Sequence, residues 1–247
     1  PEAAEMTALL EVRDLQTHFF TRAGVLKAVE GVSFGLDRGE ILGLVGESGS
    51  GKSVTGFSLI GLVDPPGRIV GGSVRFEGRE LVGLEASEMR KLRGKRIAMV
   101  FQDPAATLNP VLTIGEQMAL AVRAHDDVSE AAARERATTL LKRVGIPEAA
   151  SRLDAYPHEF SGGMRQRVAI ATALLHSPSL IIADEPTTAL DVSIQAQILT
   201  EMRALARETG TALIWISHDL ATVSSLADRV MVMYAGRIVE SGPVATT

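Results

Sequence analysis

A segment of glycine, serine and lysine residues carries the first chemistry that the sequence offers. It reads Gly46-Glu47-Ser48-Gly49-Ser50-Gly51-Lys52-Ser53 and follows a short apolar run at 41–45. The pattern G-x-x-x-x-G-K-[ST] is that of a phosphate-binding loop (P-loop), which requires a strand before it and a helix after it. Glycines let backbone N–H groups turn towards phosphate oxygens, and the helix N-terminus adds a positive dipole end. We therefore expect Lys52 to contact the β- and γ-phosphates of a nucleotide and the Ser53 hydroxyl to bind Mg²⁺.

Two carboxylates end a second apolar run. Asp184 and Glu185 come directly after Leu-Ile-Ile-Ala at 180–183. A carboxylate at a strand tip beside a P-loop is placed to hold Mg²⁺, which predicts that role for Asp184. The next carboxylate can polarise the water that attacks the γ-phosphate, which predicts that role for Glu185. Acidic residues after a strand are usually just solvated, so this prediction depends on the P-loop.

A third segment places small residues at the start of an alanine-rich helix. It reads Ser161-Gly162-Gly163 and is followed by Met-Arg-Gln-Arg. Ser161 suits the N-cap position, and two glycines leave the first helical amides accessible to an anion. A simple capped helix start is the alternative interpretation, and only the order of several motifs separates the two.

The elements that must position these residues are those of an α/β protein. Alternation of apolar and polar residues predicts two N-terminal strands joined by a turn at Ala23-Gly24, and hence an antiparallel β subdomain. Later apolar runs alternate with helical segments, which implies a mainly parallel sheet and a P-loop NTPase core. The expected strands lie near 10–15, 29–36, 41–45, 73–76, 97–101, 180–183, 213–216 and 230–233, and the expected helices at 52–62 and 193–208.

A helical insertion interrupts this core. Thr113-Ile-Gly-Glu116 and Asp127-Val-Ser-Glu130 both resemble capping boxes, and an Ala/Arg/Leu-rich stretch follows to Leu141. We interpret 1–247 as a single domain. Its nucleotide-binding core and β subdomain are expected at 8–102 and 178–243, and its helical subdomain at 103–177.

Composition narrows the classes of protein that fit. Lys plus Arg number 25 and Asp plus Glu 30, so the net charge of −5 argues against a nucleic-acid partner. The absence of Cys from the sequence excludes a disulfide, a thiolate metal site and a cysteine nucleophile. We find neither an apolar run of about 18 residues nor a secretory signal, so a cytoplasmic chain without a membrane span is expected.

The order of the motifs resembles that of the ATP-binding subunit of an ABC transporter. In that family a P-loop is followed by a Q-loop, a signature beginning SGG, a Walker B strand, a D-loop and an H-loop. The matching residues here are Gln102 in Met99-Val-Phe-Gln102, Ser161-Gly162-Gly163, Asp184-Glu185, Asp191 in Ala189-Leu-Asp191, and His218 in Ile216-Ser-His218. The resemblance covers about 8–243 and implies ATP and Mg²⁺ as cofactors.

The resemblance also implies roles for single residues. Gln102 would sense and help to hold Mg²⁺ and the attacking water, Asp191 would contact the opposite subunit, and His218 would contact the γ-phosphate. Phe19 stands before the P-loop, where the family places an aromatic residue that stacks on adenine. Its neighbour Phe20 is the alternative, because either ring could instead belong to the core of a strand.

The exact sequences of the motifs and their flanking residues resemble those of one class of importer. GESGSGKS, FQDPAATLNP, YPHEFSGGMRQRVAIA and ADEPTTALDVSIQAQIL are similar to the ATPases of oligopeptide, dipeptide and nickel importers. Met164, in place of a glutamine, resembles the D-type subunit, which pairs with a distinct F-type ATPase. The implied partners are that second ATPase, two membrane permease subunits and an extracytoplasmic solute-binding protein. The implied location is the cytoplasmic face of the inner membrane, through the permease.

Several alternatives stay open. The cassette does not touch the solute, so peptide, nickel and glutathione all fit. D-type subunits usually continue with a C-terminal extension that often carries a cysteine-ligated iron–sulfur cluster, so a truncated chain, a short relative and half of a tandem ATPase are all compatible. Other classes are an accessory ATPase of carbon–phosphorus lyase and a soluble ABC protein of translation or DNA repair. The 108 positions from Ser53 to Ser161 show no sustained heptads, which disfavours the DNA-repair branch.

Overall fold

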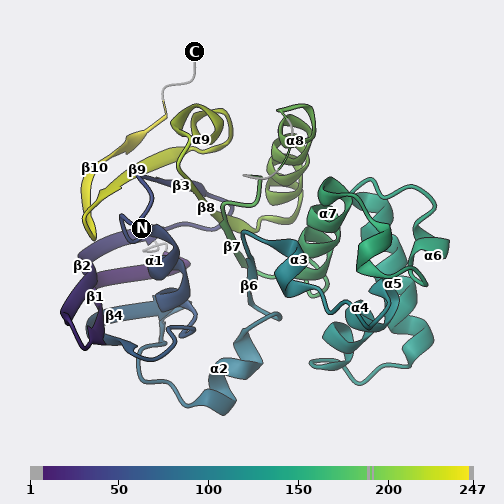
Figure 1. Ribbon diagram of the computed structural model, residues 1–247, viewed down its shortest axis with the longest axis horizontal. Coiled ribbons are helices and arrows are strands. Elements are labelled where there is room, and N and C mark those ends of the chain that lie inside the picture. Colours follow the sequence, from purple (N-terminus) through teal and green to yellow (C-terminus); the bar gives the residue numbers. More distant parts are fainter. Residues whose placement is uncertain (1–7, 188–189, 191, 245–247) are drawn as a thin grey trace, which may run out of the picture. The chain divides into compact units, whose positions relative to one another are not determined.

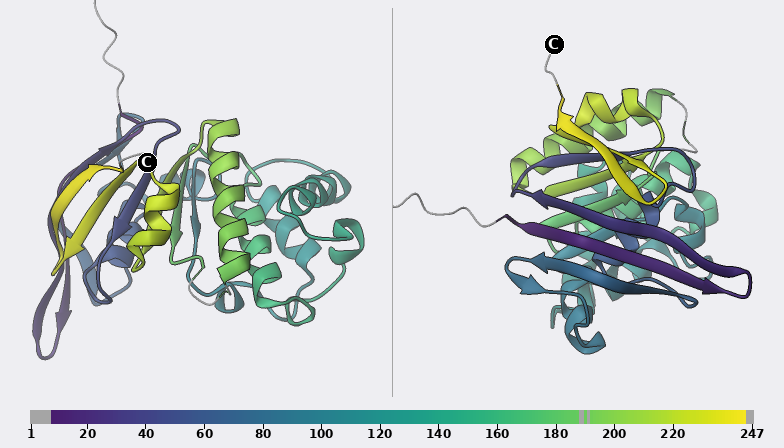
Figure 2. Two further views of the ribbon diagram at one scale, coloured as in Figure 1. Left: turned by 90° about the horizontal axis from the view of Figure 1, so that it is seen from above. Right: turned by 90° about the vertical axis from the view of Figure 1, so that its left-hand side faces the viewer.

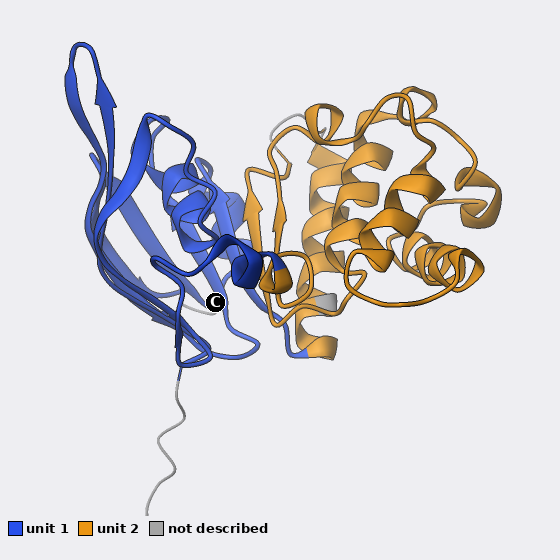
Figure 3. Cartoon of the chain, turned by 90° about the horizontal axis from the view of Figure 1, so that it is seen from below, with its two compact units in different colours: residues 1–90, 210–247 blue, residues 91–209 orange. Residues whose placement is uncertain are grey.

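The computed structural model describes residues 8–187, 190 and 192–244. Contacts divide the chain into two compact units, Pro1–Arg90 with Gly210–Thr247, and Lys91–Thr209 (Figure 3). The chain passes from the first unit to the second within helix α2 (Ala86–Leu92). The sequence predicts a different division, with a core at 8–102 and 178–243 and a helical subdomain at 103–177. These boundaries stay a prediction.

The first unit contains an antiparallel sheet, as the alternating N-terminal pattern predicts. Its strands are β1 (Leu10–Thr21), β2 (Gly24–Leu36), β4 (Gly67–Phe76) and β5 (Arg79–Glu80), in the order β2-β1-β4-β5. The right-hand view of Figure 2 shows β1 lying between β2 and β4. Leu10, Val12 and Leu15 of β1 are buried.

A mainly parallel group of strands completes the first unit. Strand β3 (Ile41–Val45) pairs in parallel with both β8 (Ala212–Ser217) and β9 (Arg229–Tyr234), and β10 (Arg237–Pro243) pairs antiparallel with β9. Every residue of β3 and β8 is buried, which explains their continuous apolar runs. Helices α1 (Lys52–Leu59) and α9 (Leu220–Leu226) accompany these strands. A Cβ on Gly43 would lie 2.0 Å from Val223 Cγ1, so glycine lets α9 pack directly on β3.

The second unit pairs two strands in parallel and is otherwise helical (Figure 1). Strands β6 (Ile97–Val100) and β7 (Leu180–Asp184) run in register from Ile97↔Leu180 to Val100↔Ala183. The helical elements are α3 (Pro104–Thr107), α4 (Ile114–Arg123), α5 (Glu130–Arg143), α6 (Ala149–Arg152), η1 (Pro157–Glu159), α7 (Gly162–Ala173) and α8 (Val192–Thr209). Across the described part of both units, no helix combines the length and apolar character that crossing a membrane requires.

One of the two predicted capping boxes forms and the other does not. The Thr113 hydroxyl accepts the backbone N–H of Glu116, whose carboxylate accepts the N–H of Thr113, at the start of α4. The prediction for Asp127 is wrong, because α5 begins two residues later than that box requires. Ser129 is the N-cap of α5, and its hydroxyl accepts the N–H of Ala132 at 3.2 Å.

Candidate functional site

The predicted P-loop lies between β3 and α1, so it has the strand before it and the helix after it that the motif requires. Gly46 and Gly51 have φ of 158° and 104°, in the range that favours glycine. A Cβ on Gly46 would lie 2.2 Å from Met233 O, and one on Gly51 would lie 2.2 Å from Ala28 O. Glycine at both positions therefore lets the loop pack directly against β9 and β2.

Lys52 places its charge inside the loop. Its side chain is buried, and Nζ donates hydrogen bonds of 2.8 Å to the carbonyls of both Gly46 and Glu47. Ser53, the next residue of α1, is half-buried. An ammonium group, a hydroxyl and the N-terminal amides of α1 form a donor set that suits a nucleotide phosphate with its Mg²⁺.

The first unit also brings His218 to the carboxyl ends of the strands, where the P-loop begins. Val45 and Ser217 are partners in the parallel β3–β8 pair, so Gly46 and His218 leave the sheet at the same end. His218 is exposed, and the next residue, Asp219, is the N-cap of α9. The hydrogen bond from the Thr222 hydroxyl lowers the pKa of Asp219, and the His218 charge acts in the same direction.

Phe19 and Phe20 have different neighbours. Phe19 is half-buried in β1 opposite Gly67 of β4, and a Cβ on Gly67 would lie 2.6 Å from its ring. Phe20 is 38% exposed, and the Arg68 guanidinium lies 4.2 Å from its ring centroid. Stacking of Phe19 on adenine stays a prediction.

In the second unit, the parallel β6–β7 pair brings Gln102 together with the Walker B carboxylates. Gln102 follows β6, Asp184 ends β7, and Glu185 follows Asp184. Gln102 Nε2 donates to Glu185 Oε2 at 3.4 Å. Asp184 is 3% exposed, and Glu185 has a φ of 44°, which is uncommon for a residue with a side chain. The arrangement joins a carboxylate to an amide that can both bind and orient a water molecule.

The signature segment forms the capped helix start that its sequence predicts. Ser161 is the N-cap of α7, and its hydroxyl accepts the N–H of Met164 at 3.3 Å. Ser161 and Gly162 are exposed, whereas Gly163 is buried. A Cβ on Gly163 would lie 3.0 Å from Ile194 Cγ2 of α8. The helix end therefore presents accessible amides, while Asp191 lies outside the described residues.

One half-buried charge in the signature helix was not singled out from the sequence. Arg167 of α7 is 12% exposed at its side chain and lies 3.8 Å from the carboxylate of Glu201 in α8. The two residues are 34 positions apart, and no local pattern connects them. Only the packing of the helices reveals the pair.

Comparison with known proteins identifies the family. The family model described as "ABC transporter" matches residues 29–188, which is more than half of the chain. The oligopeptide transport ATP-binding protein OppD of Bacillus subtilis is 53% identical over 97% of this chain and 67% of its own length. OppD of Escherichia coli is 54% identical over 95% of this chain and 69% of its own length.

Solved structures agree with these relatives. The ATP-binding cassette MJ0796, in a dimeric post-hydrolysis state bound to ADP and Pi, superimposes with a TM-score of 0.86 at 27% identity, covering 96% of this chain and all of that one. CbiO1 of Clostridium perfringens, from the cbiONQ transporter complex, gives a TM-score of 0.79 at 27% identity, covering 96% of this chain and 88% of its own. The chain belongs to the ABC transporter family, in which it is an ATP-hydrolysing subunit with the α/β cassette fold.

Proposed function

We propose that this chain powers peptide import as one of two ATPase subunits of a multi-subunit transporter. The observation that carries the proposal is the 53–54% identity to two oligopeptide transport proteins over 95–97% of the chain. The sequence of the signature motif supports the peptide-importer class, since Met164 follows Ser161-Gly-Gly in this chain as in D-type subunits. Peptide is therefore proposed ahead of nickel and glutathione.

The P-loop side of the proposed site binds the nucleotide. Lys52 exchanges the carbonyls of Gly46 and Glu47 for the β- and γ-phosphate oxygens, so the loop holds its charge in place before ATP arrives. The amides of 46–53 donate to the remaining phosphate oxygens. His218 contacts the γ-phosphate, and Phe19 stacks on adenine. A charge held in position beforehand needs little reorganisation when the nucleotide binds.

The Walker B side of the proposed site supplies the base. Glu185 polarises the attacking water, and Gln102, 3.4 Å from its carboxylate, orients the same water. Ser53, Asp184 and Gln102 would hold Mg²⁺, which neutralises charge on the β- and γ-phosphates when it is bound. Because Asp184 is buried and ends a strand, its carboxylate is restricted to few orientations.

Two ATPase subunits close head to tail in this proposal. Each nucleotide lies between the P-loop of one subunit and the Ser161-Gly162-Gly163 helix end of the other, with Asp191 at the contact. The exposure of Ser161 and Gly162 supports this, because amides that meet a partner's nucleotide must be accessible in the single chain. Hydrolysis removes the γ-phosphate contacts and lets the pair reopen, so ATP biases a two-state switch. Two permease subunits, a solute-binding protein and an F-type ATPase are the proposed partners, at the cytoplasmic face of the inner membrane.

A deletion strain tests the peptide assignment. The gene for this chain is removed, and uptake of a labelled tripeptide, a labelled pentapeptide, Ni²⁺ and glutathione is measured. We expect loss of peptide uptake alone, restored by the wild-type chain and not by Lys52→Ala. Retained peptide uptake with lost Ni²⁺ or glutathione uptake would reassign the solute. Retained uptake of all four, with no permease co-purifying with the tagged chain, would overturn the transport role.

A further inference from the structure

Arg167 connects the signature helix to two other helices of the second unit. From α7, its Nη1 donates to the carbonyls of Val144 and Gly145, at 3.3 and 3.1 Å, where α5 ends. Its Nη2 lies 3.8 Å from Glu201 Oε1 of α8. A planar guanidinium can make these contacts at once, whereas an ammonium group offers a single charged point. Arg167 is therefore built into the joint between α5, α7 and α8.

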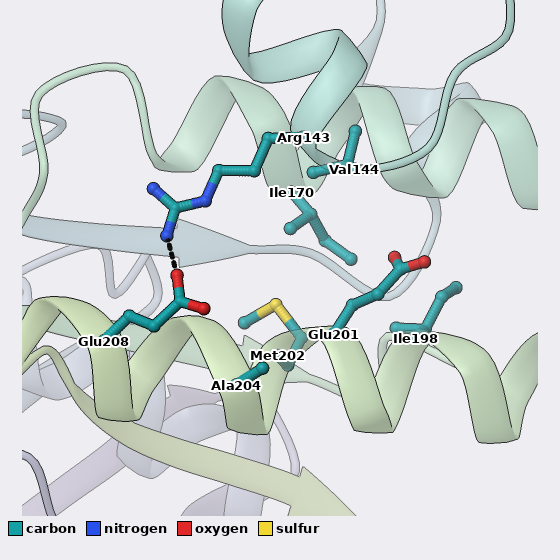
Figure 4. Close-up of a pocket in the computed structure, with 8 residues that line it drawn as sticks. All are labelled: Arg143, Val144, Ile170, Ile198, Glu201, Met202, Ala204 and Glu208. Carbon is teal, nitrogen blue, oxygen red and sulfur yellow. Dashed lines mark hydrogen bonds and ion pairs between the residues drawn. The ribbon is translucent and has the colours of Figure 1, made fainter.

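Glu201 is the α8 side of this joint. Burial raises the pKa of Glu201, and the Arg167 guanidinium opposes that rise. A cavity of about 150 Å³ lies beside the carboxylate, and Figure 4 shows Glu201 on its wall next to Met202. Space that is not filled by apolar side chains contributes little packing energy. The charge pair adds a polar contact between α7 and α8 beside this cavity, which buried Ile170 of α7 and Met202 of α8 also line.

A different contact joins the same helices near their N-terminal ends. A Cβ on Gly163 would lie 3.0 Å from Ile194 Cγ2, so glycine lets α7 and α8 approach closely at the signature segment. One residue further along α8, Gln195 Nε2 donates to the Thr187 hydroxyl at 3.1 Å. Thr187 is buried and follows Glu185 by two positions. A continuous set of contacts thus runs from the signature helix through α8 to the segment that carries the general base.

We propose that Arg167 is a positioning residue which, through Glu201, makes the signature helix and α8 move as one body. The inference rests on the proposed head-to-tail closure. The signature end of α7 then completes the partner's ATP site, while α8 and Thr187 support Glu185 in this chain's own site. Closure on the partner's nucleotide thereby sets the orientation of Glu185, which couples the two sites through packed side chains.

Two conservative variants and one matched control test the coupling in the assembled transporter. Glu201→Gln keeps the shape of the side chain and removes its charge, and Arg167→Lys keeps the charge and removes the fork. Glu208→Gln is the control. This substitution removes a carboxylate from the same helix and the same cavity wall. Glu208 pairs with Arg143 of α5 at 2.5 Å, and among the described residues it has no hydrogen bond or ion pair with α7 (Figure 4).

The expected result separates turnover from binding. In the complex, kcat of Glu201→Gln and of Arg167→Lys falls roughly fivefold or more, and the double variant loses no more than either single variant. ATP affinity of the purified chain stays at the value of Glu208→Gln for both variants, and the thermal unfolding midpoint of Glu201→Gln stays there as well. The control itself keeps wild-type kcat.

Other outcomes overturn the inference in distinct ways. Variants whose kcat matches that of Glu208→Gln show that the pair does not act in turnover. Single losses that multiply in the double variant show that the two residues do not act as a unit. A fall in kcat of Glu201→Gln matched by a lower unfolding midpoint of the same variant assigns the pair a structural role only. A wild-type complex without ATP turnover contradicts the proposed function instead.

Discussion

Glu185 combines an uncommon backbone conformation with a specific polar neighbour. Its φ of 44° directs the chain sharply out of β7, and its carboxylate accepts a hydrogen bond from Gln102. Residues in such conformations cost about 1–3 kcal/mol and cluster at functional sites, where their position matters more than their stability. The preceding carboxylate, Asp184, is buried at the strand end. Adjacent carboxylates in such different surroundings fit different roles, a metal ligand and a base.

Replacement of Glu185 by glutamine tests the base. The variant keeps the size of the side chain and removes the group that polarises water, so turnover of the assembled complex should fall by about 10²–10⁴-fold. ATP binding to the purified chain should be retained. Glu135→Gln, on the exposed side of α5, is the control and should leave both unchanged. Turnover above half of the wild-type rate would refute the assignment of Glu185.

The adenine contact is tested by two neighbouring alanine substitutions. Phe19→Ala should raise the ATP dissociation constant through lost stacking, on a scale of roughly 1–3 kcal/mol borrowed from base–aromatic stacking. Phe19→Tyr should bind ATP like the wild type. Phe20→Ala removes only the ring that Arg68 covers and should leave the dissociation constant unchanged. The opposite order of effects, measured by titration with a fluorescent ATP analogue, would move the contact to Phe20.

At the scale of elements, each pair of parallel strands brings two of the site motifs close together. The Val45↔Ser217 pairing brings the P-loop and His218 to one sheet edge, and the Val100↔Ala183 pairing does the same for Gln102 and the Walker B carboxylates. Parallel strands end at a common edge, so motifs that directly follow neighbouring strands must lie close together. Motifs that are more than 80 positions apart in the sequence therefore become neighbours in the fold.

The start of α5 offers a test at the same scale. Ser129→Ala removes the hydroxyl that accepts the Ala132 N–H and should lower the free energy of unfolding by about 1 kcal/mol. Asp127→Ala lies outside the cap and should change it by less than about 0.5 kcal/mol. Urea unfolding of the purified chain measures both. A larger loss for Asp127→Ala would restore the capping box that the sequence predicts at that residue.

At the scale of the whole molecule, the proposed assembly makes the two ATP sites unequal. A D-type subunit with an F-type partner contributes its P-loop to one site and its Ser161 segment to the other. A single P-loop face leaves the γ-phosphate half solvated, so the isolated chain should hydrolyse ATP slowly and the complex much faster. The measurement is the ATP turnover rate as a function of chain concentration, with and without the partner ATPase and permease. A purified chain that works at the rate of the complex would contradict shared sites.

Ser161→Arg separates the two sites. A bulky cation at the N-cap of α7 should block closure on the partner's nucleotide and nearly abolish turnover of the complex, while ATP binding at this chain's own P-loop stays within about twofold of the wild type. Ser151→Arg makes the same change at an exposed position of α6 and serves as the control. Loss of the chain's own ATP binding in Ser161→Arg would mean that one nucleotide is held by both motifs of one chain.

Local chemistry explains what the sequence by itself determined. The P-loop, the cap at Ser161 and the capping box at Thr113 each depend on residues within a few positions of one another, so their patterns are readable without packing. The strands at 41–45, 180–184 and 212–217 are buried on both faces, and their uninterrupted apolar runs predict them well. Motif order was enough to predict the family.

Tertiary structure decided the features that local patterns do not encode. Strand β10 was not predicted, because an edge strand with mostly exposed side chains lacks an apolar pattern and forms by pairing with β9. Ser129 rather than Asp127 caps α5, although both residue types suit an N-cap. The Arg167–Glu201 pair and the Gln102–Glu185 hydrogen bond join residues 34 and 83 positions apart. Such contacts exist only once the strands and helices have packed, since burial and distance, not residue type, select the partner.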